Sequence, residues 1–204
     1  VNALALCLNQ DRFGELIDLF DGLWDIRDRV IDTPLHPDDT FEDDPLRMLR
    51  AIRFATRLYF TIHQDVFDSI QRNREKILTV APERLSEEIN KIMLSDTPSV
   101  GFELLFITGL LQLILPELQA LQGVEKMNGR GHKDNFFHTL EVLDNMAKAT
   151  KDWEDDEKRL WIRWATLLHD IGKPKSKRWE PSVGWTFHNH NAIGEKMVPV
   201  LFKR

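Results

Sequence analysis

The feature that most constrains the fold is a succession of amphipathic segments from Asp44 to the end of the chain. Apolar residues recur there every three or four positions, which is the spacing of one face of an α-helix. Strand-like alternation is nearly absent after residue 34. We therefore expect an all-α protein, with helices from Asp44 onward and over 65–78, 82–95, 98–111, 136–150, 156–170 and 191–203.

The first 34 residues differ from the rest. Residues 1–10 have the composition of a short apolar helix, while ELIDLF (15–20) and RVIDTP (29–34) resemble short extended segments. GLWDIRD (22–28) between them is typical of a helical turn, and Gly14, Gly22 and Pro34 punctuate the region. This pattern predicts a small α/β unit in front of the helices.

Composition excludes several classes of protein. The 204 residues contain one cysteine, Cys7, so no disulfide framework is possible and a reducing, cytoplasmic location is expected. The longest apolar stretch, residues 102–115, is too short to cross a bilayer, so no membrane association is expected. The net charge is −6, so any contact with RNA must come from a local basic patch.

The ends of the sequence suggest a longer protein. The chain begins at Val1 rather than at a methionine and stops after VLFKR without an evident end signal. We therefore expect a fragment whose chemistry is incomplete on its own.

Four arginines share one side of the first long helix. At about 100° per residue, Arg47, Arg50, Arg53 and Arg57 fall within about 120° of each other. The apolar positions occupy the opposite side, and Asp43, Asp44 and Pro45 stand at the start, where they favour helix initiation.

Two interpretations of this arginine stripe are open. The arginines could pair with acidic side chains elsewhere in an acidic protein. Alternatively, the stripe could bind phosphates or bases, because guanidinium groups donate to phosphate and to ring nitrogens. A carboxylate and an arginine one turn apart could together read the amino group and ring nitrogen of cytosine or adenine.

A family resemblance favours the second interpretation. The segments VNALAL (1–6), LIDLFDGLWDI (16–26), DDPLRMLRAIRFATRLYF (43–60) and ERLSEE (83–88) resemble, in this order, the bacterial class II tRNA nucleotidyltransferase and poly(A) polymerase family. The resemblance implies a head domain, a helical neck with a nucleotide template, and CCA addition to tRNA with CTP, ATP and Mg²⁺. Poly(A) synthesis is the alternative, since the template would accept ATP in both enzymes.

The resemblance also implies roles for individual residues. Asp44 and Arg47 match the template pair that selects CTP or ATP, and Arg50 and Arg53 match further nucleotide-binding arginines. Glu83, Arg84 and Glu88 match a motif that braces the neck, and Asn2 matches the end of a head motif. The phosphate-binding Gly-Ser and the paired metal-binding aspartates of the family are absent from this sequence. Phosphoryl transfer needs such carboxylates to hold Mg²⁺, so the chain alone is expected to be inactive in nucleotide transfer.

A second group of chemically active residues lies near the end of the chain. His169 and Asp170 close an apolar segment, WATLLHDIGKP (164–174), and His138 and His190 stand in HTL and FHNH. Imidazole and carboxylate together suit divalent transition metals. Each histidine taken singly is more often an ordinary core or surface residue.

Taken together, these residues resemble the HD phosphohydrolase superfamily. The resemblance implies that His138, His169 and Asp170 are metal ligands, that His190 is a second-metal ligand, and that Lys173 contacts phosphate. His132 and His188 are weaker candidates. The superfamily has a closing aspartate on a later helix, for which this sequence offers only Glu180 and Glu195, so the site is expected to be incomplete.

These observations predict three parts: a remnant of a nucleotidyltransferase head (1–33), a helical neck that binds nucleotide and tRNA (34–125), and a C-terminally truncated HD domain (126–204). Two rival functions remain open. One is a metal-dependent HD phosphohydrolase whose neck binds RNA, and the other is a non-catalytic RNA-binding module whose affinity falls steeply with salt.

Overall fold

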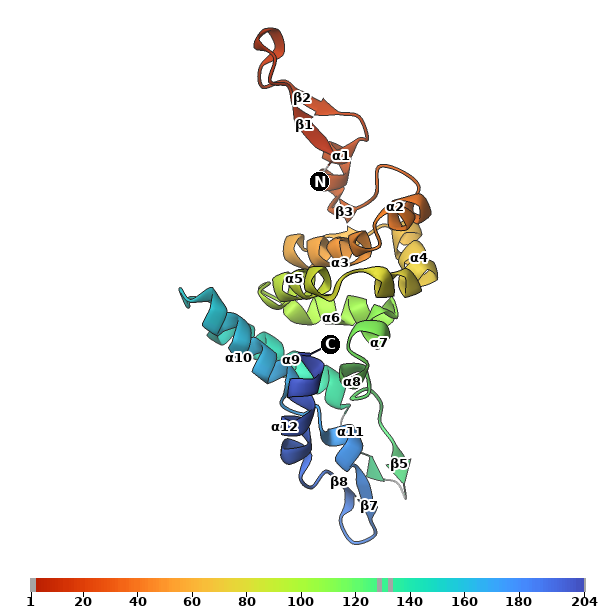
Figure 1. Ribbon diagram of the computed structural model, residues 1–204, viewed down its shortest axis with the longest axis vertical. Helices are drawn as coiled ribbons and strands as arrows, with labels where there is room; N and C mark the ends of the chain where they lie inside the picture. The colour runs from red at the N-terminus through yellow and green to blue at the C-terminus, as the bar shows by residue number, and fades with distance from the viewer. Residues whose placement is uncertain (1–2, 128–129, 132–133, 204) are drawn as a thin grey trace.

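The computed structural model describes residues 3–127, 130–131 and 134–203, so Asn2 and His132 lie outside the described residues. The molecule is elongated and mostly helical (Figure 1). A β-hairpin stands at one end, a block of helices fills the middle, and a second hairpin lies at the other end. The prediction of an all-α protein with a small α/β unit in front is confirmed.

The N-terminal unit is built from β1 (Leu4–Leu6), β2 (Leu16–Asp18), α1 (Gly22–Asp28) and β3 (Val30–Ile31), with a 3-10 turn at Gln10–Arg12. β1 and β2 pair antiparallel, with Leu4 opposite Asp18. The expected helix over residues 1–10 is therefore wrong, because the backbone groups of Leu4–Leu6 are paired across the hairpin instead of within a helix. The two extended segments and the helical turn are confirmed.

The middle of the molecule contains α2 (Pro37–Asp43), α3 (Leu46–Leu58), α4 (Gln64–Asn73) with a following 3-10 segment (Arg74–Thr79), α5 (Pro82–Met93), α6 (Pro98–Ile107), α7 (Leu110–Ile114) and α8 (Pro116–Gln119). The expected helix over 98–111 is broken at Gly109, whose φ of +80° lies in the region that glycine adopts most readily. α2 was not anticipated.

The last part contains α9 (Asn135–Ala149), α10 (Asp156–Leu168), α11 (Lys173–Ser176) and α12 (His190–Leu201). α9, α10 and α12 begin and end within two residues of the expected bounds, whereas α11 was not anticipated. Asp134 caps α9 by accepting from Phe136 N, and Asp155 caps α10 by accepting from Lys158 N.

Short strand pairs occur after residue 34, contrary to expectation. β4 (Thr61–Ile62) pairs parallel with β3, while β5 (Lys126–Met127) pairs with β6 (Arg130–Gly131) and β7 (Arg178–Glu180) with β8 (Gly184–Thr186), both antiparallel. Each strand has two or three residues, which is too short for a periodic sequence signal.

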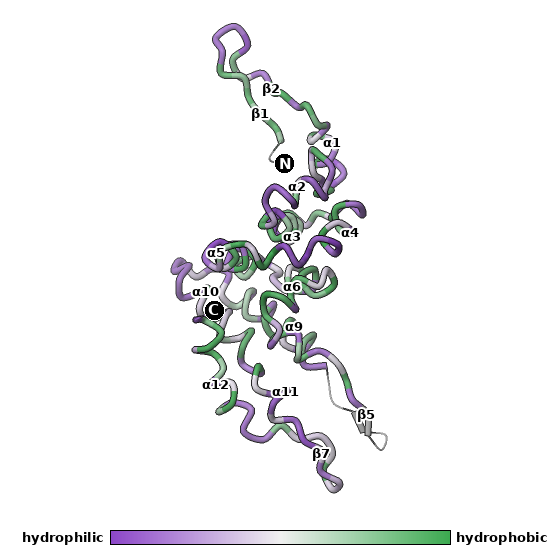
Figure 2. The backbone as a smooth tube through the Cα atoms, turned by 45° about the vertical axis from the view of Figure 1, so that its right-hand side comes forward, coloured by the Kyte–Doolittle hydropathy of each residue, from purple (hydrophilic) through white to green (hydrophobic). Residues whose placement is uncertain are grey.

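The hydrophobic core runs without a break from the middle helices into the last part of the chain. The five apolar-face positions expected on α3 are all buried: Met48, Leu49, Ile52, Ala55 and Thr56. The four apolar ones belong to one cluster that also contains Phe102, Leu140 and Leu167 from α6, α9 and α10. Figure 2 shows hydrophobic and hydrophilic stretches alternating through the middle helices, and a hydrophobic β1 near the N-terminus.

A buried arginine joins α5, α9 and α10. Arg163 on α10 is 2% exposed and donates to the carbonyl oxygens of Met93 and Ser95, each at 2.8 Å, and of Ala147 at 3.0 Å. Its Nε donates to Thr150 Oγ1 at 3.1 Å. These acceptors lie at the ends of α5 and α9, where the helix dipole is negative and stabilises a cation. Arg163 therefore fixes α5 of the middle part against the last part of the chain.

Among the described residues, no helix is long and apolar enough to cross a membrane.

Candidate functional site

Asp44, the proposed base reader, lies between α2 and α3 with both carboxylate oxygens engaged. Its Oδ1 accepts from Leu46 N at 3.2 Å and so caps the start of α3. Its Oδ2 accepts from Nη2 of Arg84 on α5 at 3.0 Å. The side chain is 25% exposed, so one edge of the carboxylate remains accessible from solvent.

Arg47 lies one turn after Asp44 and takes different partners. Its Nη1 donates to the Thr40 carbonyl at 3.2 Å and lies 3.7 Å from Asp43 Oδ2. The backbone N–H of Arg47 donates to the Asp44 carbonyl oxygen at 3.0 Å, but no side-chain contact between the two occurs among the described residues. The two side chains of the proposed template pair are thus oriented independently, Asp44 by α5 and the start of α3, and Arg47 by α2.

Arg53 is largely buried rather than open to solvent. Its side chain is 12% exposed, and its Nε lies 2.9 Å from Glu88 Oε2 on α5, although the N–H is not aligned for a hydrogen bond. The guanidinium carbon lies 4.2 Å from the centre of the Phe54 ring. Burial lowers the pKa of Arg53, Glu88 opposes this effect, and the nearby Arg50 and Arg57 add to it.

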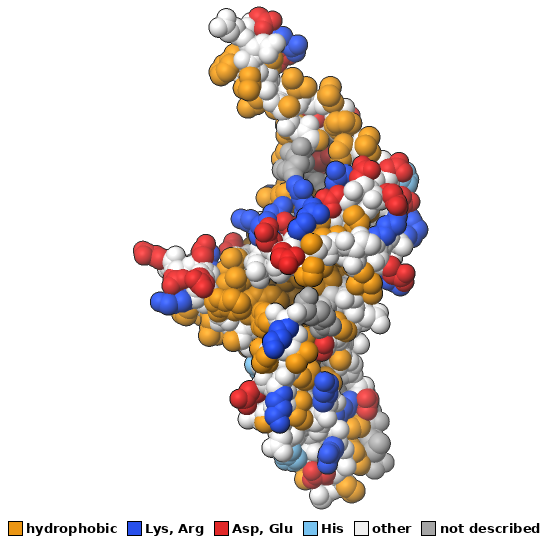
Figure 3. Space-filling model, viewed as in Figure 1, with side chains coloured by type: hydrophobic (Ala, Val, Ile, Leu, Met, Phe, Trp, Pro, Cys, Tyr) orange, Lys and Arg blue, Asp and Glu red, His pale blue; other side chains and the backbone are white. Residues whose placement is uncertain are grey.

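Arg50 is half-buried and Arg57 is exposed, and neither has an ion-pair partner among the described residues. Lys and Arg side chains gather over the region of α3, with acidic side chains beside them (Figure 3). The first interpretation therefore holds for Arg53, which pairs with an acid of α5, whereas the binding of an anion by Arg50 and Arg57 stays a prediction.

α5 contacts α3 and the residue before it through the ERLSEE segment (83–88). Arg84 contacts Asp44, and Glu88 contacts Arg53. Lys91 completes the arrangement by donating to Glu88 Oε1 at 3.0 Å. The two residues of the expected brace that make these contacts are four positions apart, which places them on one face of the helix.

The second cluster surrounds Asp170, just after α10. The Asp170 side chain is 6% exposed, and Lys173 Nζ lies 2.6 Å from its Oδ2. His169 Nε2 lies 3.1 Å from the same oxygen, and His190 Nε2 lies 3.5 Å from Oδ1. Lys173 also donates to Asn135 Oδ1 at 3.2 Å. The carboxylate is therefore surrounded by three basic side chains.

The electrostatics of this cluster follow from these contacts. Burial raises the pKa of Asp170, but the hydrogen bonds from His169 and Lys173 outweigh it and hold the value at about 2. The hydrogen bond to Asp170 raises the pKa of His169, and the Thr166 carbonyl at 2.7 Å from its Nδ1 acts in the same direction.

A close approach of two backbones brings His190 to Asp170. A Cβ added to Gly172 would lie 2.0 Å from the His190 carbonyl oxygen, so another side chain there would push α12 away. Gly194 in α12 faces the same junction, and its added Cβ would meet Ile171 at an ordinary 3.4 Å.

The ligand set expected for a metal is brought together only in part. His169 and His190 each contact Asp170, whereas no contact links His138 on α9 to Asp170 within the described ranges. Over those ranges, no group of three His, Cys, Asp or Glu side chains is placed to hold a metal ion. With Lys173 on one carboxylate oxygen, this arrangement does not fit a metal, and the metal ligands remain a prediction.

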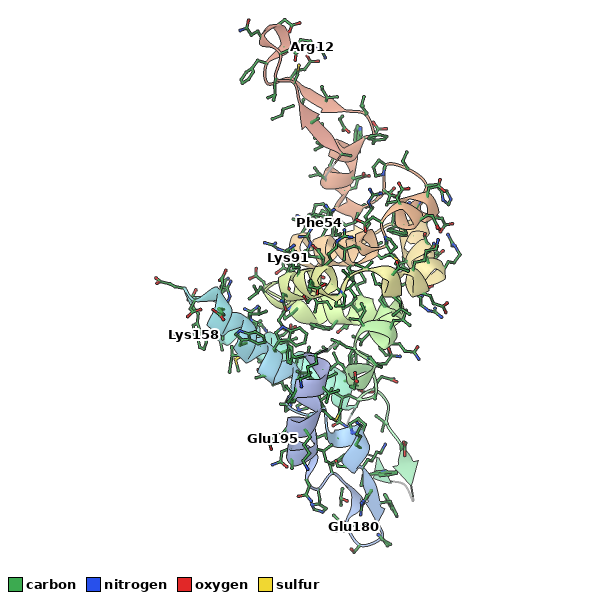
Figure 4. All side chains as sticks on the ribbon, in the orientation of Figure 1. Arg12, Phe54, Lys91, Lys158, Glu180 and Glu195 are labelled. Atoms are coloured by element: carbon green, nitrogen blue, oxygen red, sulfur yellow. The ribbon has the colours of Figure 1, made fainter. Side chains whose placement is uncertain are left out.

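A groove of about 390 Å³ opens beside His169, between α10 and α12. Aromatic side chains line it, namely Trp161, Trp164 and Phe202, together with Glu195, which is labelled in Figure 4. The groove leaves His169 accessible, with a side chain 39% exposed.

Sequence reasoning missed two residues that organise these sites. Asn135 precedes the HTL segment by one turn and positions Lys173. Arg163 follows no motif, although a lone arginine in the apolar segment of α10 was a signal of a buried cation that needs acceptors.

Two family models match the chain. The model described as "Probable RNA and SrmB- binding site of polymerase A" matches residues 59–121, and the HD domain model matches residues 135–204. Among curated proteins, the A-adding tRNA nucleotidyltransferase of Deinococcus radiodurans is 33% identical over 211 residues, which covers 100% of this chain and 46% of that protein. The chain belongs to the CCA-adding tRNA nucleotidyltransferase family.

Other members of the tRNA nucleotidyltransferase family agree with this assignment. The multifunctional CCA protein of Pasteurella multocida is 35% identical over 85% of this chain and 40% of its own length. A solved CCA-adding enzyme with ATP is 26% identical, with a TM-score of 0.60 over 82% of this chain and 37% of that one. The Thermotoga maritima CCA-adding enzyme complexed with tRNA shares the fold, with a TM-score of 0.61 over 99% of this chain and 47% of that one at 24% identity. The chain thus spans about half the length of the relatives it matches.

Proposed function

We propose that this chain supplies nucleotide and tRNA recognition to an enzyme that adds CCA to tRNA 3′ ends from CTP and ATP. Asp44 and Arg47 would read the base, and Arg50 and Arg53 would make further contacts with the nucleotide. The arrangement of Asp44 carries this proposal: Arg84 and the start of α3 fix the carboxylate, and Arg47 stands one turn away.

The chemistry of the bases explains the expected selectivity. Cytosine and adenine each present an exocyclic amino group next to an acceptor nitrogen, while uracil and guanine present a carbonyl oxygen at the equivalent place. A carboxylate accepts from the amino group and a guanidinium donates to the ring nitrogen. Asp44 and Arg47 would therefore accept CTP and ATP and disfavour UTP and GTP.

Within this proposal the chain has three parts, over residues 1–33, 34–125 and 126–204. The continuous core and Arg163 support a neck and an HD part that are packed as one block. Transfer itself would use carboxylates and Mg²⁺ in the head of the whole enzyme, since phosphoryl transfer needs a metal to neutralise developing charge.

Arg50 provides the first test, because it lacks an ion-pair partner among the described residues. Arg50→Ala should weaken binding of CTP and ATP several-fold in a calorimetric titration, since a guanidinium–phosphate contact is lost. Lys158→Ala, which removes an exposed cation on α10, is the matched control and should leave both affinities unchanged (Figure 4). Equal affinities for Arg50→Ala and the wild type would return the stripe to a structural role.

Poly(A) synthesis is the neighbouring alternative. An A-adding relative and a multifunctional CCA relative match this chain comparably, at 33% and 35% identity. Binding of CTP as tight as that of ATP supports CCA addition, and ATP binding without CTP binding supports A addition.

A metal-dependent phosphohydrolase is the rival from another class. It requires His138, His169, Asp170 and His190 to converge, and Lys173 to bind phosphate instead of Asp170. Metal analysis and phosphodiester hydrolysis by the purified chain, beside His169→Ala, separate the two functions: metal and turnover that disappear in the variant would favour the phosphohydrolase.

A further inference from the structure

Phe54 lies within the arginine stripe of α3. At about 100° per residue its direction falls between those of Arg47 and Arg50. It is half-buried, with part of the ring packed against the core. An aromatic ring among cations is the composition of surfaces that bind nucleotides by stacking.

The guanidinium of Arg53 lies over this ring, 4.2 Å from its centre. Glu88 holds the Nε side of the same guanidinium at 2.9 Å, and Lys91 holds Glu88 in turn. Arg53 is therefore fixed from two sides, by an aromatic face and by a buried carboxylate. Its plane is set by these neighbours and has little freedom to rotate.

We propose that Arg53 and Phe54 form a stacking layer for a nucleobase, in which Phe54 sets the plane of the Arg53 guanidinium. This inference rests on the proposed function and assigns the flat base of CTP, ATP or an RNA end as the ligand of the layer. A guanidinium plane and an aromatic ring both stack on bases, and they do so without selecting among them. Selection would stay with Asp44 and Arg47.

The flanking charges support a nucleotide rather than another flat ligand. Arg50 and Arg57 lie one turn to either side of Phe54 and have no ion-pair partner among the described residues. The phosphates of a nucleotide, which are joined to the stacked base through the ribose, would lie near these two cations. An apolar or cationic aromatic compound would meet unfavourable charge at the same place.

Phe54→Leu is the central test, because leucine keeps an apolar side chain on the core and removes the aromatic face. Affinities of the purified chain for ATP, CTP and inorganic tripolyphosphate would be measured by calorimetry. We expect about tenfold weaker binding of ATP and CTP, which is the usual effect of losing one stacking partner, and unchanged binding of tripolyphosphate, which has no base.

Three further variants make the result specific. Phe60→Leu removes a partly buried ring just beyond α3, away from the stripe, and should leave all affinities unchanged. Phe54→Tyr keeps the ring and should bind as the wild type does. Arg53→Lys keeps the positive charge but removes the planar guanidinium. It should weaken the binding of ATP and CTP and leave the binding of tripolyphosphate unchanged.

The inference is overturned if Phe54→Leu binds ATP and CTP as tightly as the wild type. It is also overturned if tripolyphosphate binding falls by the same factor, because the loss would then concern charge or folding. Either result leaves the proposed function intact as long as the wild type prefers CTP and ATP. Failure of the wild type to bind any nucleotide would contradict both the stacking layer and the proposed function.

Discussion

Arg84 Nη2 on α5 lies 3.0 Å from Asp44 Oδ2 at the start of α3, across forty positions of sequence. The contact orients a carboxylate whose other oxygen already caps the helix. A residue that accepts from a base must present its lone pairs in a fixed direction, and Arg84 supplies that constraint. Arg84 is thus a positioning residue for the proposed base reader.

Replacing Arg84 tests this role. Arg84→Ala should weaken CTP and ATP binding by up to about fivefold, since an exposed ion pair contributes about 0.2–1 kcal/mol. The same range bounds the loss in free energy of unfolding. Calorimetric titration measures the nucleotide affinities and urea unfolding measures the stability. The control is Arg72→Ala, which removes an arginine of α4 that pairs with Asp38 of α2. A nucleotide affinity equal to that of the wild type would show that Asp44 is oriented without Arg84.

Arg163 should be among the most destabilising positions in the chain. Arg163→Met leaves four acceptors without their donor, and each buried unsatisfied group costs about 1–3 kcal/mol. We expect a loss of at least about 3 kcal/mol in the free energy of unfolding, measured in urea. Arg159→Met, one turn earlier, breaks a pair with the exposed Asp156 and should cost less than about 1 kcal/mol. Similar losses of unfolding free energy in the two variants would contradict the role of Arg163 in joining α5, α9 and α10.

Gly172 and Gly194 form a matched pair at the α11–α12 junction. Gly172→Ala places a Cβ 2.0 Å from the His190 carbonyl and should destabilise the fold by about 1–3 kcal/mol through overpacking. Gly194→Ala meets Ile171 at 3.4 Å and should be neutral or stabilising, because alanine favours a helix over glycine by about 1 kcal/mol. Thermal unfolding measures both, and a reversed order would contradict the close approach.

Asp38 should make the stability of the α2–α4 contact depend on pH. Hydrogen bonds from Ser69, Arg72 and Asn73 lower the pKa of Asp38 below the ordinary value of an aspartate, against the effect of burial. A lowered carboxyl pKa contributes stability above the unfolded value, and this contribution is lost as the pH falls through the folded value. Asp38→Asn should therefore cost about 1 kcal/mol at pH 7 and progressively less below about pH 4. If Asp38→Asn lowered the free energy of unfolding by the same amount across this pH range, ionisation of Asp38 would not contribute to stability.

Helical periodicity was sufficient for most of the fold. The apolar face of α3 and the bounds of α5, α9 and α10 followed from spacing, because burial against a common core requires that spacing. The β1–β2 hairpin did not, since LAL is apolar without alternation and its pairing depends on residues more than ten positions away. The strands after residue 34 are too short for any local pattern.

The candidate sites show the same limit. Sequence patterns placed His169, Asp170 and His190 in one cluster, and the structure joins them. Asn135, which contacts Lys173 in this cluster, gave no signal in sequence because it acts through a tertiary contact. Arg84 and Glu88 were expected to brace the neck, but their partners, Asp44 and Arg53, followed only from the structure. Arg53 illustrates the consequence: its spacing put it on an open stripe, whereas Glu88 and Phe54 enclose it.

The most direct test of the central claim compares CTP, ATP, UTP and GTP in titrations of the wild-type chain and of Asp44→Asn. The account predicts tighter binding of CTP and ATP by the wild type, and loss of that preference in the variant, because an amide can also donate to the carbonyl oxygen of uracil or guanine. Equal affinities for all four nucleotides in the wild type, or an unchanged preference in the variant, would contradict the assignment of Asp44 as the base reader.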